Sequence, residues 1–398
     1  MNKINFIFLR SDIALADQEL DSKRMEFLYE IQKENIVLSS SGLPLFYIES
    51  GGSEEKFKKK YKDYSAPYIL LATSSNNSLP ASLEIMSFLR NNNLEAYLIH
   101  GEMDELIKGV KNLSVDKIDS TYEFKKNDYL KGERLGVIGK PSDWLIASLT
   151  NYKEVKERTG AELIDITFEE FKEEIEKHIL PSFTNEIIDQ YENEKIKKDT
   201  IIGALYIYSA LKSLIEKYDL NGLTVRCFDL LGTIKNTSCL ALALLNSEGI
   251  TATCEGDVPS MLSMHYVLKL LNEESFQCNP SYINVINNYI VLAHCTLPLS
   301  MSYSSKFDTH FESGIGLGIK GELSEENVTI FKLNNNLTKM TLIEGNISEN
   351  LNKSNLCRTQ IKVRSKENLK TLLDTPLGNH LIVFYGNHRD ELLKKLGL

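Results

Sequence analysis

The chain has 398 residues, of which 42% are hydrophobic and 25% are charged, and its formal net charge is −10 at pH 7. This length predicts two or three domains, and the composition is typical of an ordinary soluble globular protein rather than a disordered or fibrous one. The negative charge argues against nucleic acid as a partner, because neutralising phosphates requires clustered Lys and Arg.

Short apolar runs alternate with segments of helical periodicity in residues 1–132. The runs predict buried strands at residues 5–10, 43–49, 68–73 and 95–101. Between them, segments such as residues 78–93 place apolar residues at helical spacing. This alternation predicts a first α/β domain, with a parallel sheet covered by helices.

The same pattern restarts after a polar stretch and predicts a second α/β domain over residues 133–295. We expect strands at residues 134–139, 161–166, 223–230, 250–256 and 289–295. The expected helices are one from about Ser142 and others within residues 168–179, 185–218, 239–249 and 260–271.

From residue 296 the sequence pattern changes to alternating or β-branched runs separated by Gly and Asn turns. Such runs occur at residues 314–323, 327–334, 339–347, 357–364 and 379–386. They predict an antiparallel, barrel-like domain over residues 296–398.

Sequence features also bear on compartment. No stretch approaches the roughly eighteen apolar residues of a membrane helix, and the amino terminus meets Arg10 and Asp12 too early for a secretory signal. The six cysteines lie scattered in the second half without a Cys-x-x-Cys pair. We therefore expect reduced thiols in a cytoplasmic protein without a membrane partner.

Acids and histidines follow several predicted strands, where open α/β sheets bind their ligands. Asp229, Glu255, Asp257 and His294 end strands of the second domain. The β-rich region adds three further candidates, His310, Glu312 and His380. Carboxylates with neutral imidazoles suit a divalent cation such as Mn²⁺, and oxygen-rich sites also suit Mg²⁺.

Each of these residues also has a structural alternative. Asp257 is equally explained as the N-cap of the following helix, with Gly256 relieving the turn, and Asp229 as another helix cap. His294 fits a hydrogen-bonded core histidine and His380 a loop residue. Glu312 and His310 fit a surface ion pair.

Two strand-to-helix loops are crowded with hydroxyls and amides and predict polyol binding. Residues 73–82 contain Asn77, and residues 139–148 contain Ser142 and Trp144, the only tryptophan, which is suited to stack on a sugar face. Helix capping is the alternative for Ser142. The glycines of residues 314–321 have the wrong spacing for a nucleotide site, and the sequence has neither a P-loop nor a G-x-S-x-G elbow.

A set of motifs in chain order resembles the L-fucose isomerase and L-arabinose isomerase superfamily. The motifs are NNSLPAS (76–82), GKPSDWLIAS (139–148), CLALALLNSEG (239–249), CEGD (254–257), LAHCTLPL (292–299), THFESGIGLGI (309–319), CRTQ (357–360) and GNH (378–380). The resemblance implies two Rossmann-like (flavodoxin-like) parallel-sheet domains followed by a β-barrel domain. It also implies a homo-oligomer, a trimer or hexamer with shared active sites, in which Trp144 and Asn77 serve a neighbouring subunit's pocket.

The resemblance further implies a metal-dependent aldose–ketose isomerase that uses Mn²⁺ or another divalent cation such as Mg²⁺ or Co²⁺. Glu255 or Asp257 matches the family's acidic cluster after a strand. His294 and His380 match its two histidine segments, although leucine replaces a second histidine after His380. Asp229 is the nearest acid to the position of the other family carboxylate, where glutamate is usual.

The expected chemistry moves a carbonyl from C1 to C2 through an enediol, with Asp229, Glu255 and Asp257 as the candidate proton-shuttling carboxylates. If the sugar carries a sulfonate, as in sulfoquinovose, or a phosphate, Arg358 and Lys140 are the expected anion-binding residues. A catalytically silent sugar-binding or regulatory protein on the same fold is the alternative from a different class.

Overall fold

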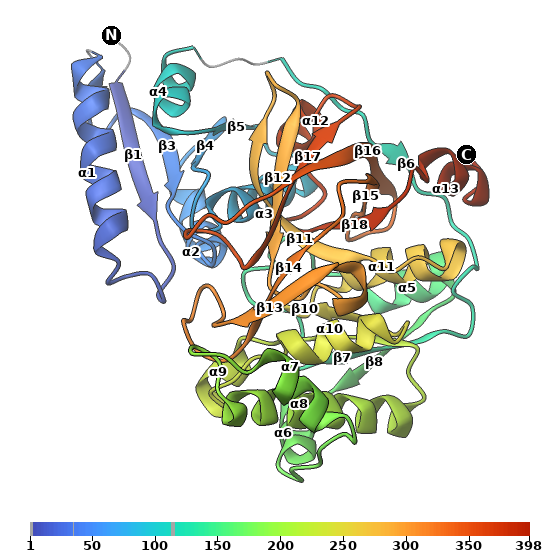
Figure 1. The fold of residues 1–398 in the computed structure, drawn as a ribbon. Coiled ribbons are helices and arrows are strands. Elements are labelled where there is room, and N and C mark those ends of the chain that lie inside the picture. The colour runs from blue at the N-terminus through green and yellow to red at the C-terminus, as the bar shows by residue number, and fades with distance from the viewer. Residues whose placement is uncertain (1–2, 35, 113–115) are drawn as a thin grey trace.

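The computed structural model describes residues 3–34, 36–112 and 116–398. These residues form two parallel sheets, an antiparallel barrel and a two-stranded ribbon. In Figure 1 the N-terminal sheet lies at the left, the barrel at the upper right and the second parallel sheet below them. The predicted fold class is therefore confirmed.

The N-terminal sheet has helices on both faces. Its strand order is β2-β1-β3-β4-β5, with β1 (Lys3–Leu9), β2 (Val37–Leu38), β3 (Leu43–Ile48), β4 (Tyr68–Ala72) and β5 (Ala96–His100), all parallel. Side chains alternate along the strands between two hydrophobic clusters. The helices are α1 (Gln18–Lys33), α2 (Glu54–Lys60), α3 (Ser78–Asn91) and α4 (Met103–Lys111). Among them α3 is the most deeply enclosed, because even its polar residues such as Glu84 are buried.

The second parallel sheet has the order β10-β9-β7-β8, with β7 (Arg134–Ile138), β8 (Glu162–Ile166), β9 (Gly222–Val225) and β10 (Thr251–Cys254). Its helices are α5 (Tyr152–Thr159), α6 (Phe168–Ile175), α7 (Thr184–Tyr191), α8 (Lys198–Tyr218), α9 (Asp229–Thr233), α10 (Cys239–Ser247) and α11 (Val258–Leu271). Among the helices that the structure describes, none is both long and apolar enough for a membrane span.

The helix expected from Ser142 begins only at Tyr152, so that prediction is wrong. The backbone N–H groups of Ala147 and Ser148 donate to the buried Glu84 carboxylate on α3, at 2.7 and 2.9 Å. Because these groups are satisfied by a side chain of another element, the segment forms turns rather than a helix.

The barrel closes on itself through six antiparallel strands in the order β15-β18-β11-β12-β17-β16, with β15 pairing back onto β16. The strands are β11 (Phe276–Asn284), β12 (Tyr289–His294), β15 (Asn327–Leu333), β16 (Lys339–Asn350), β17 (Thr359–Ser365) and β18 (Leu381–Tyr385). The short strand β6 (Tyr122–Glu123) pairs antiparallel with the first residues of β16. The short helices α12 (Lys370–Asp374) and α13 (Arg389–Lys395) follow β17 and β18. Closure leaves the six barrel strands without an exposed edge.

The sequence prediction differs from this arrangement in three places. The predicted boundary at residue 295 cuts through the barrel, because β12 pairs with β11 and β17 rather than with the second parallel sheet. The expected strand at residues 314–323 is β14 (Gly318–Glu322), which pairs with β13 (Ser304–Asp308) in the separate ribbon. The sequence prediction also missed β11, whose Pro280 lies at a register shift, where a proline can be accommodated in a strand.

The turn between β10 and α11 is tight and left-handed. Glu255 and Gly256 have φ values of 66° and 70°. Asp257 then caps α11, accepting a hydrogen bond from the Ser260 backbone N–H at 2.8 Å. A Cβ on Gly256 would lie 2.5 Å from the Lys140 carbonyl oxygen. Both the conformation and the close approach therefore require glycine at this position.

Replacing Gly256 with alanine is expected to lower the free energy of unfolding by about 3 kcal/mol or more, because the clash with residue 140 adds to left-handed backbone strain. The matched control is Gly249→Ala, where φ is 75° but no atom lies within 4 Å of the added Cβ. That control should cost only about 1–2 kcal/mol. Equal losses for the two variants in urea titrations would contradict the role of the close approach.

Candidate functional site

A cavity of about 630 Å³ lies between the N-terminal sheet, the β10–α11 turn and the loops of the barrel and ribbon. Its walls include Asn77, Trp144, Glu255, Glu312 and Asn379. The volume is in the range of small-molecule sites. Asn77 and Trp144, which the resemblance assigned to a neighbouring subunit's pocket, thus line the same cavity as Glu255 within one chain.

Glu255, His294 and His380 form a buried cluster, in which Glu255 lines this cavity and His294 lines a much smaller space of about 20 Å³ that also contacts Glu255. Their candidate ligand atoms all lie within 4.8 Å of one another. Glu255 comes from the β10–α11 turn, His294 ends β12, and His380 directly precedes β18. Three segments far apart in the sequence therefore meet at one point.

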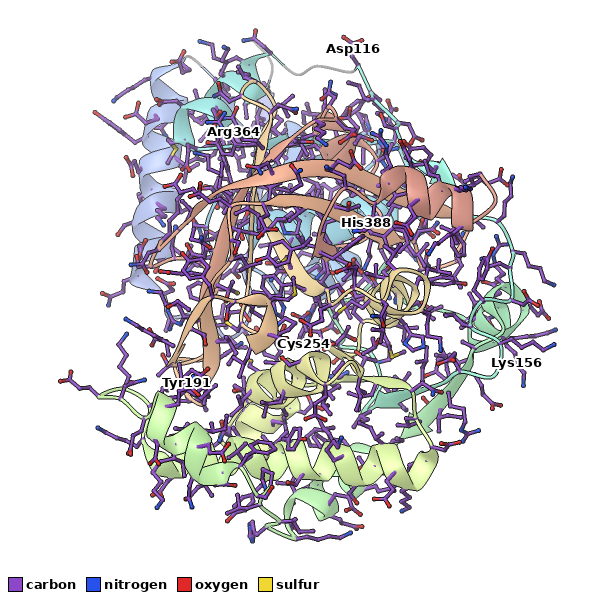
Figure 2. All side chains as sticks on the ribbon, turned by 45° about the vertical axis from the view of Figure 1, so that its right-hand side comes forward. Asp116, Lys156, Tyr191, Cys254, Arg364 and His388 are labelled. Carbon is purple, nitrogen blue, oxygen red and sulfur yellow. The ribbon has the colours of Figure 1, made fainter. Side chains whose placement is uncertain are left out.

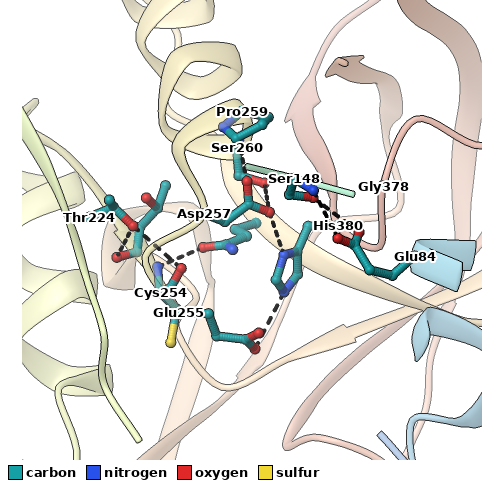
Figure 3. Close-up of polar contacts among 12 residues, drawn as sticks. Glu84, Ser148, Thr224, Cys254, Glu255, Asp257, Pro259, Ser260, Gly378 and His380 are labelled. Carbon is teal, nitrogen blue, oxygen red and sulfur yellow. Dashed lines mark hydrogen bonds and ion pairs between the residues drawn. The ribbon is translucent and has the colours of Figure 1, made fainter. Parts of the chain in front are cut away.

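The Asp257 carboxylate contacts the ring nitrogen of His380 that points away from Glu255 (Figure 3). Asp257 Oδ2 lies 2.7 Å from His380 Nδ1, while His380 Nε2 lies 3.4 Å from Glu255 Oε1. The Lys332 ammonium, from β15, lies 3.3 Å from Asp257 Oδ2 and donates to Ser260 Oγ at 2.8 Å. Asp257 is therefore a cap of α11 and a support for His380, whereas Glu255 faces the cavity.

The electrostatics of the two histidines differ. Burial would lower the pKa of His380, but the Glu255 and Asp257 carboxylates raise it to about 9. Burial lowers the pKa of His294 to about 3, and the nearby His380 adds to this effect. His294 Nδ1 lies 2.9 Å from Thr296 Oγ1, an arrangement that leaves its Nε2 available as a ligand. Burial opposes ionisation of Glu255, yet His380, His294 and the Trp144 indole lower its pKa.

A second carboxylate, Glu312, lies in the cavity wall on the loop between β13 and β14. Its Oε1 accepts a hydrogen bond from Asn77 Nδ2 at 2.6 Å. Enclosure and the nearby Glu255 raise the pKa of Glu312 to about 7. Glu312 is therefore a second carboxyl group near Glu255, and it can be either protonated or ionised near neutral pH.

Trp144 contacts both Glu255 and the aromatic residue Phe228 of the cavity wall. Its indole Nε1 donates to Glu255 Oε2 at 2.6 Å. Its ring packs edge-on against Phe228, at 4.9 Å between centroids, and Phe228 in turn contacts His310. His310 and Glu312 thus both lie near the cluster, but as separate wall residues and not as the ion pair considered from the sequence, since His310 Nδ1 is 3.0 Å from Ser313 Oγ.

Four other residues predicted for the site are not among those that line the cavity. Asp229 pairs with Arg226 at 3.0 Å, and 40% of its side chain is exposed. Lys140 is exposed, and the Arg358 guanidinium donates to the Thr309 carbonyl at 2.6 Å. Ser142 is buried and its backbone N–H donates to the Glu255 carbonyl at 3.0 Å. Ser142 thus supports the turn that carries Glu255.

Sequence reasoning missed several residues that shape the site, namely Glu54, Glu84, Asn279, Lys332 and Asn379. Lys332 occupies an alternating strand, where a lysine usually points to solvent, but its side chain is fully buried. Asn379 was within the GNH motif, so adjacency to His380 was an available signal. Asn279 lies on β11, the strand that was itself missed.

Known proteins give a limited comparison. No family model matches the chain. Two curated proteins named sulfoquinovose isomerase are weakly similar to it. The one from Clostridium sp. (strain MSTE9) is 24% identical over 200 residues, 47% of this chain and 44% of that protein. The one from Alkalicoccus urumqiensis is 24% identical over 229 residues, 55% of this chain and 49% of that protein. The chain spans about half the length of the curated relatives it matches.

The buried Glu84 predicts a measurable pH dependence. Burial raises the pKa of Glu84 from 4.5 to about 7, so between these values the folded state keeps a proton that the unfolded state releases. Stability should therefore fall by about 3 kcal/mol from pH 4.5 to 7 and change no further above that range through this group. In denaturant titrations Glu84→Gln should lack this component, and the exposed control Glu186→Gln should keep it. An unchanged slope in Glu84→Gln would refute the assignment.

Proposed function

We propose that this protein is an aldose–ketose isomerase that binds Mn²⁺, or another divalent cation such as Mg²⁺ or Co²⁺, through Glu255, His294 and His380. The observation that carries the proposal is the buried meeting of this carboxylate with two imidazoles, of which Glu255 faces a cavity in the range of small-molecule sites. The names of the two weakly similar proteins support the same class of reaction.

The chemistry of the three residues fits such a cation. Within the described part of the chain His380 Nε2 is buried without a hydrogen-bond partner, although Asp257 fixes the other ring nitrogen. A carboxylate-supported histidine of this kind is a common metal ligand. One carboxylate and two imidazoles suit Mn²⁺ and Co²⁺, and Mg²⁺ less well. When bound, the cation polarises the sugar's carbonyl and hydroxyl oxygens and offsets the charge of the developing enediol.

Glu312 is positioned to move the proton between the two carbons. Asn77 occupies its Oε1, which leaves Oε2 to take a proton from C2 of the aldose and to return it to C1, while the hydroxyl proton passes from O2 to O1. A pKa near 7 allows the group both to accept and to release a proton at neutral pH. Glu255 is the other carboxylate of the pair and stays ionised beside His380 and Trp144. In this proposal Asp257 positions His380 and does not transfer protons.

The cavity wall is suited to a ligand with many hydroxyl groups. Among the described residues, four buried acceptor atoms in the wall have no hydrogen-bond partner: Glu54 Oε2, Asn77 Oδ1, Asn279 Oδ1 and Asn379 Oδ1. Sugar hydroxyls would donate to such atoms, and an unpaired buried acceptor costs about 1–3 kcal/mol. The wall therefore favours a polyol over an apolar ligand.

The charge of the wall favours an uncharged aldose over an anionic one. The acidic wall residues are Asp17, Glu19, Glu54, Glu255 and Glu312, and the described wall contains neither Lys nor Arg. Burial raises the pKa of both Glu54 and Glu312, which reduces their share of this negative charge. A sulfonated sugar such as sulfoquinovose is the second candidate, because both similar proteins are named for it. Binding of that sulfonate would require a basic residue from outside this wall, such as Lys140, Arg358 or a neighbouring subunit. The trimer or hexamer remains a prediction.

Two glutamine variants should separate metal binding from proton transfer. Glu255→Gln is expected to weaken Mn²⁺ binding roughly 100-fold or more in calorimetric titrations and to abolish metal-dependent turnover. Glu312→Gln should bind Mn²⁺ nearly as well as the unmodified protein but lose activity by about 100-fold or more. Glu186→Gln is the exposed control. Unchanged Mn²⁺ affinity in Glu255→Gln would exclude this metal site.

A sugar panel followed by NMR, with Mn²⁺ and with EDTA, tests the reaction and its substrate. We expect metal-dependent interconversion of at least one uncharged aldose with its ketose. Turnover of sulfonated or phosphorylated aldoses alone would keep the isomerase and overturn the preference for an uncharged sugar. Sugar binding without turnover across the panel would identify a silent binding protein.

A further inference from the structure

Five of the six cysteines gather around one small space. Cys227, Cys239, Cys254, Cys295 and Cys357 line a cavity of about 20 Å³. Asn77, Phe228, Glu255, Asn279 and Glu312 line both this space and the larger cavity. All these thiols are free and buried, including Cys254, which is labelled in Figure 2. A small molecule that enters the larger cavity therefore reaches the rim of a thiol-lined space.

Two of these thiols lie in direct contact. The sulfurs of Cys227 and Cys254 lie 2.7 Å apart. Cys254 ends β10, and Cys227 lies two residues beyond the end of the parallel neighbour β9. The two thiols therefore face each other across adjacent ends of one sheet, where the backbone already holds them side by side.

We propose that Cys227 and Cys254 are an oxidation site at which a peroxide forms an intramolecular disulfide. A disulfide bond is about 2.05 Å long, so a small side-chain movement joins the pair. Cys295 and Cys357 are the competing pair. The Cys357 thiol, together with the backbone N–H groups of Arg358 and Phe311, lowers the pKa of the Cys295 thiol, but only the Cys227 and Cys254 sulfurs are placed by the sheet at 2.7 Å.

The reaction balances with peroxide as the two-electron oxidant. The Cys227 sulfur attacks one peroxide oxygen, the O–O bond breaks, and the other oxygen leaves as water after taking the thiol proton. The Cys254 sulfur then attacks the resulting sulfenic acid. The S–S bond forms, the S–O bond breaks, and the hydroxyl group leaves as a second water with the Cys254 proton. Two thiols and one hydrogen peroxide thus give one disulfide and two waters.

The bond would connect two walls of the cavity. Cys227 is followed by Phe228 and Cys254 by Glu255, and both of these neighbours line the cavity. Trp144 contacts both, through its hydrogen bond to Glu255 and its packing on Phe228. Because Trp144 is the only tryptophan, its fluorescence reports directly on this place.

The test is to treat the full-length protein with hydrogen peroxide, block remaining thiols and map peptides without reduction. We expect a linked Cys227–Cys254 peptide with a mass about 2 Da below the sum of the two thiol peptides. Trp144 emission should change in parallel, and both signals should revert with dithiothreitol. Cys227→Ala and Cys254→Ala should lose the link and the emission change. Cys278→Ala, a buried thiol on β11 that does not line the small cavity, should keep both.

A link between Cys295 and Cys357 in place of the expected one, or sulfinic acids without any link, would overturn the proposal. If an alanine variant does not fold, the peptide map of the unmodified protein decides alone. The result is also independent of the proposed isomerase, because neither a metal ion nor turnover enters the measurement.

Discussion

The contact between Asp257 and His380 joins the parts of the molecule that must meet for the site to exist. Asp257 caps α11 of the second parallel sheet, His380 directly precedes barrel strand β18, and both side chains are fully buried. Lys332 from β15 compensates the carboxylate. Removing one partner of a buried ionic group typically costs about 3–5 kcal/mol, because the remaining charge is left without compensation. The orientation of His380 toward Glu255 therefore depends on the docking of the sheet against the barrel.

The CEGD turn illustrates how capping and chemistry coexist. The two carboxylates are separated by a glycine in the left-handed region, so they point to different surroundings. Asp257 enters the protein interior, where it caps a helix and supports an imidazole. Glu255 faces the cavity and accepts the Trp144 indole N–H. The sequence left open which acid takes which role, and the backbone conformation separates them.

The fold was more predictable than the site. Parallel strands such as β4 and β7 are apolar runs buried on both faces, a pattern that can be recognised locally. In contrast, β11 contains Asn279 and Pro280, which read as a turn when the bulge that accommodates them is unknown. The predicted helix from Ser142 failed because Glu84, more than 50 positions earlier, binds the backbone that the helix would need. Such long-range contacts have no local sequence signal.

The same distinction applies to the site residues. Histidines and acids at strand ends were visible as candidates, but the meeting of Glu255, His294 and His380 depends on barrel closure. Lys332 lies on an alternating strand, where a lysine usually points to solvent, but in the closed barrel its side chain is buried. Asp229 occupied a plausible position in the sequence, yet a salt bridge to Arg226 directs it elsewhere.

The enclosure of α3 has a consequence for how a ligand enters and leaves. This helix buries 11 of its residues, contacts barrel strand β11 as well as its own sheet, and presents Asn77 to Glu312 at its first turn. Swinging the N-terminal sheet away as a rigid lid would expose that whole surface to water. We therefore expect ligands to enter and leave on the side of the cavity where the segment around Ile13 and Asp17 forms part of the wall. Ligand exchange would then be governed by a short surface loop, on the timescale of local loop motion and not of domain opening.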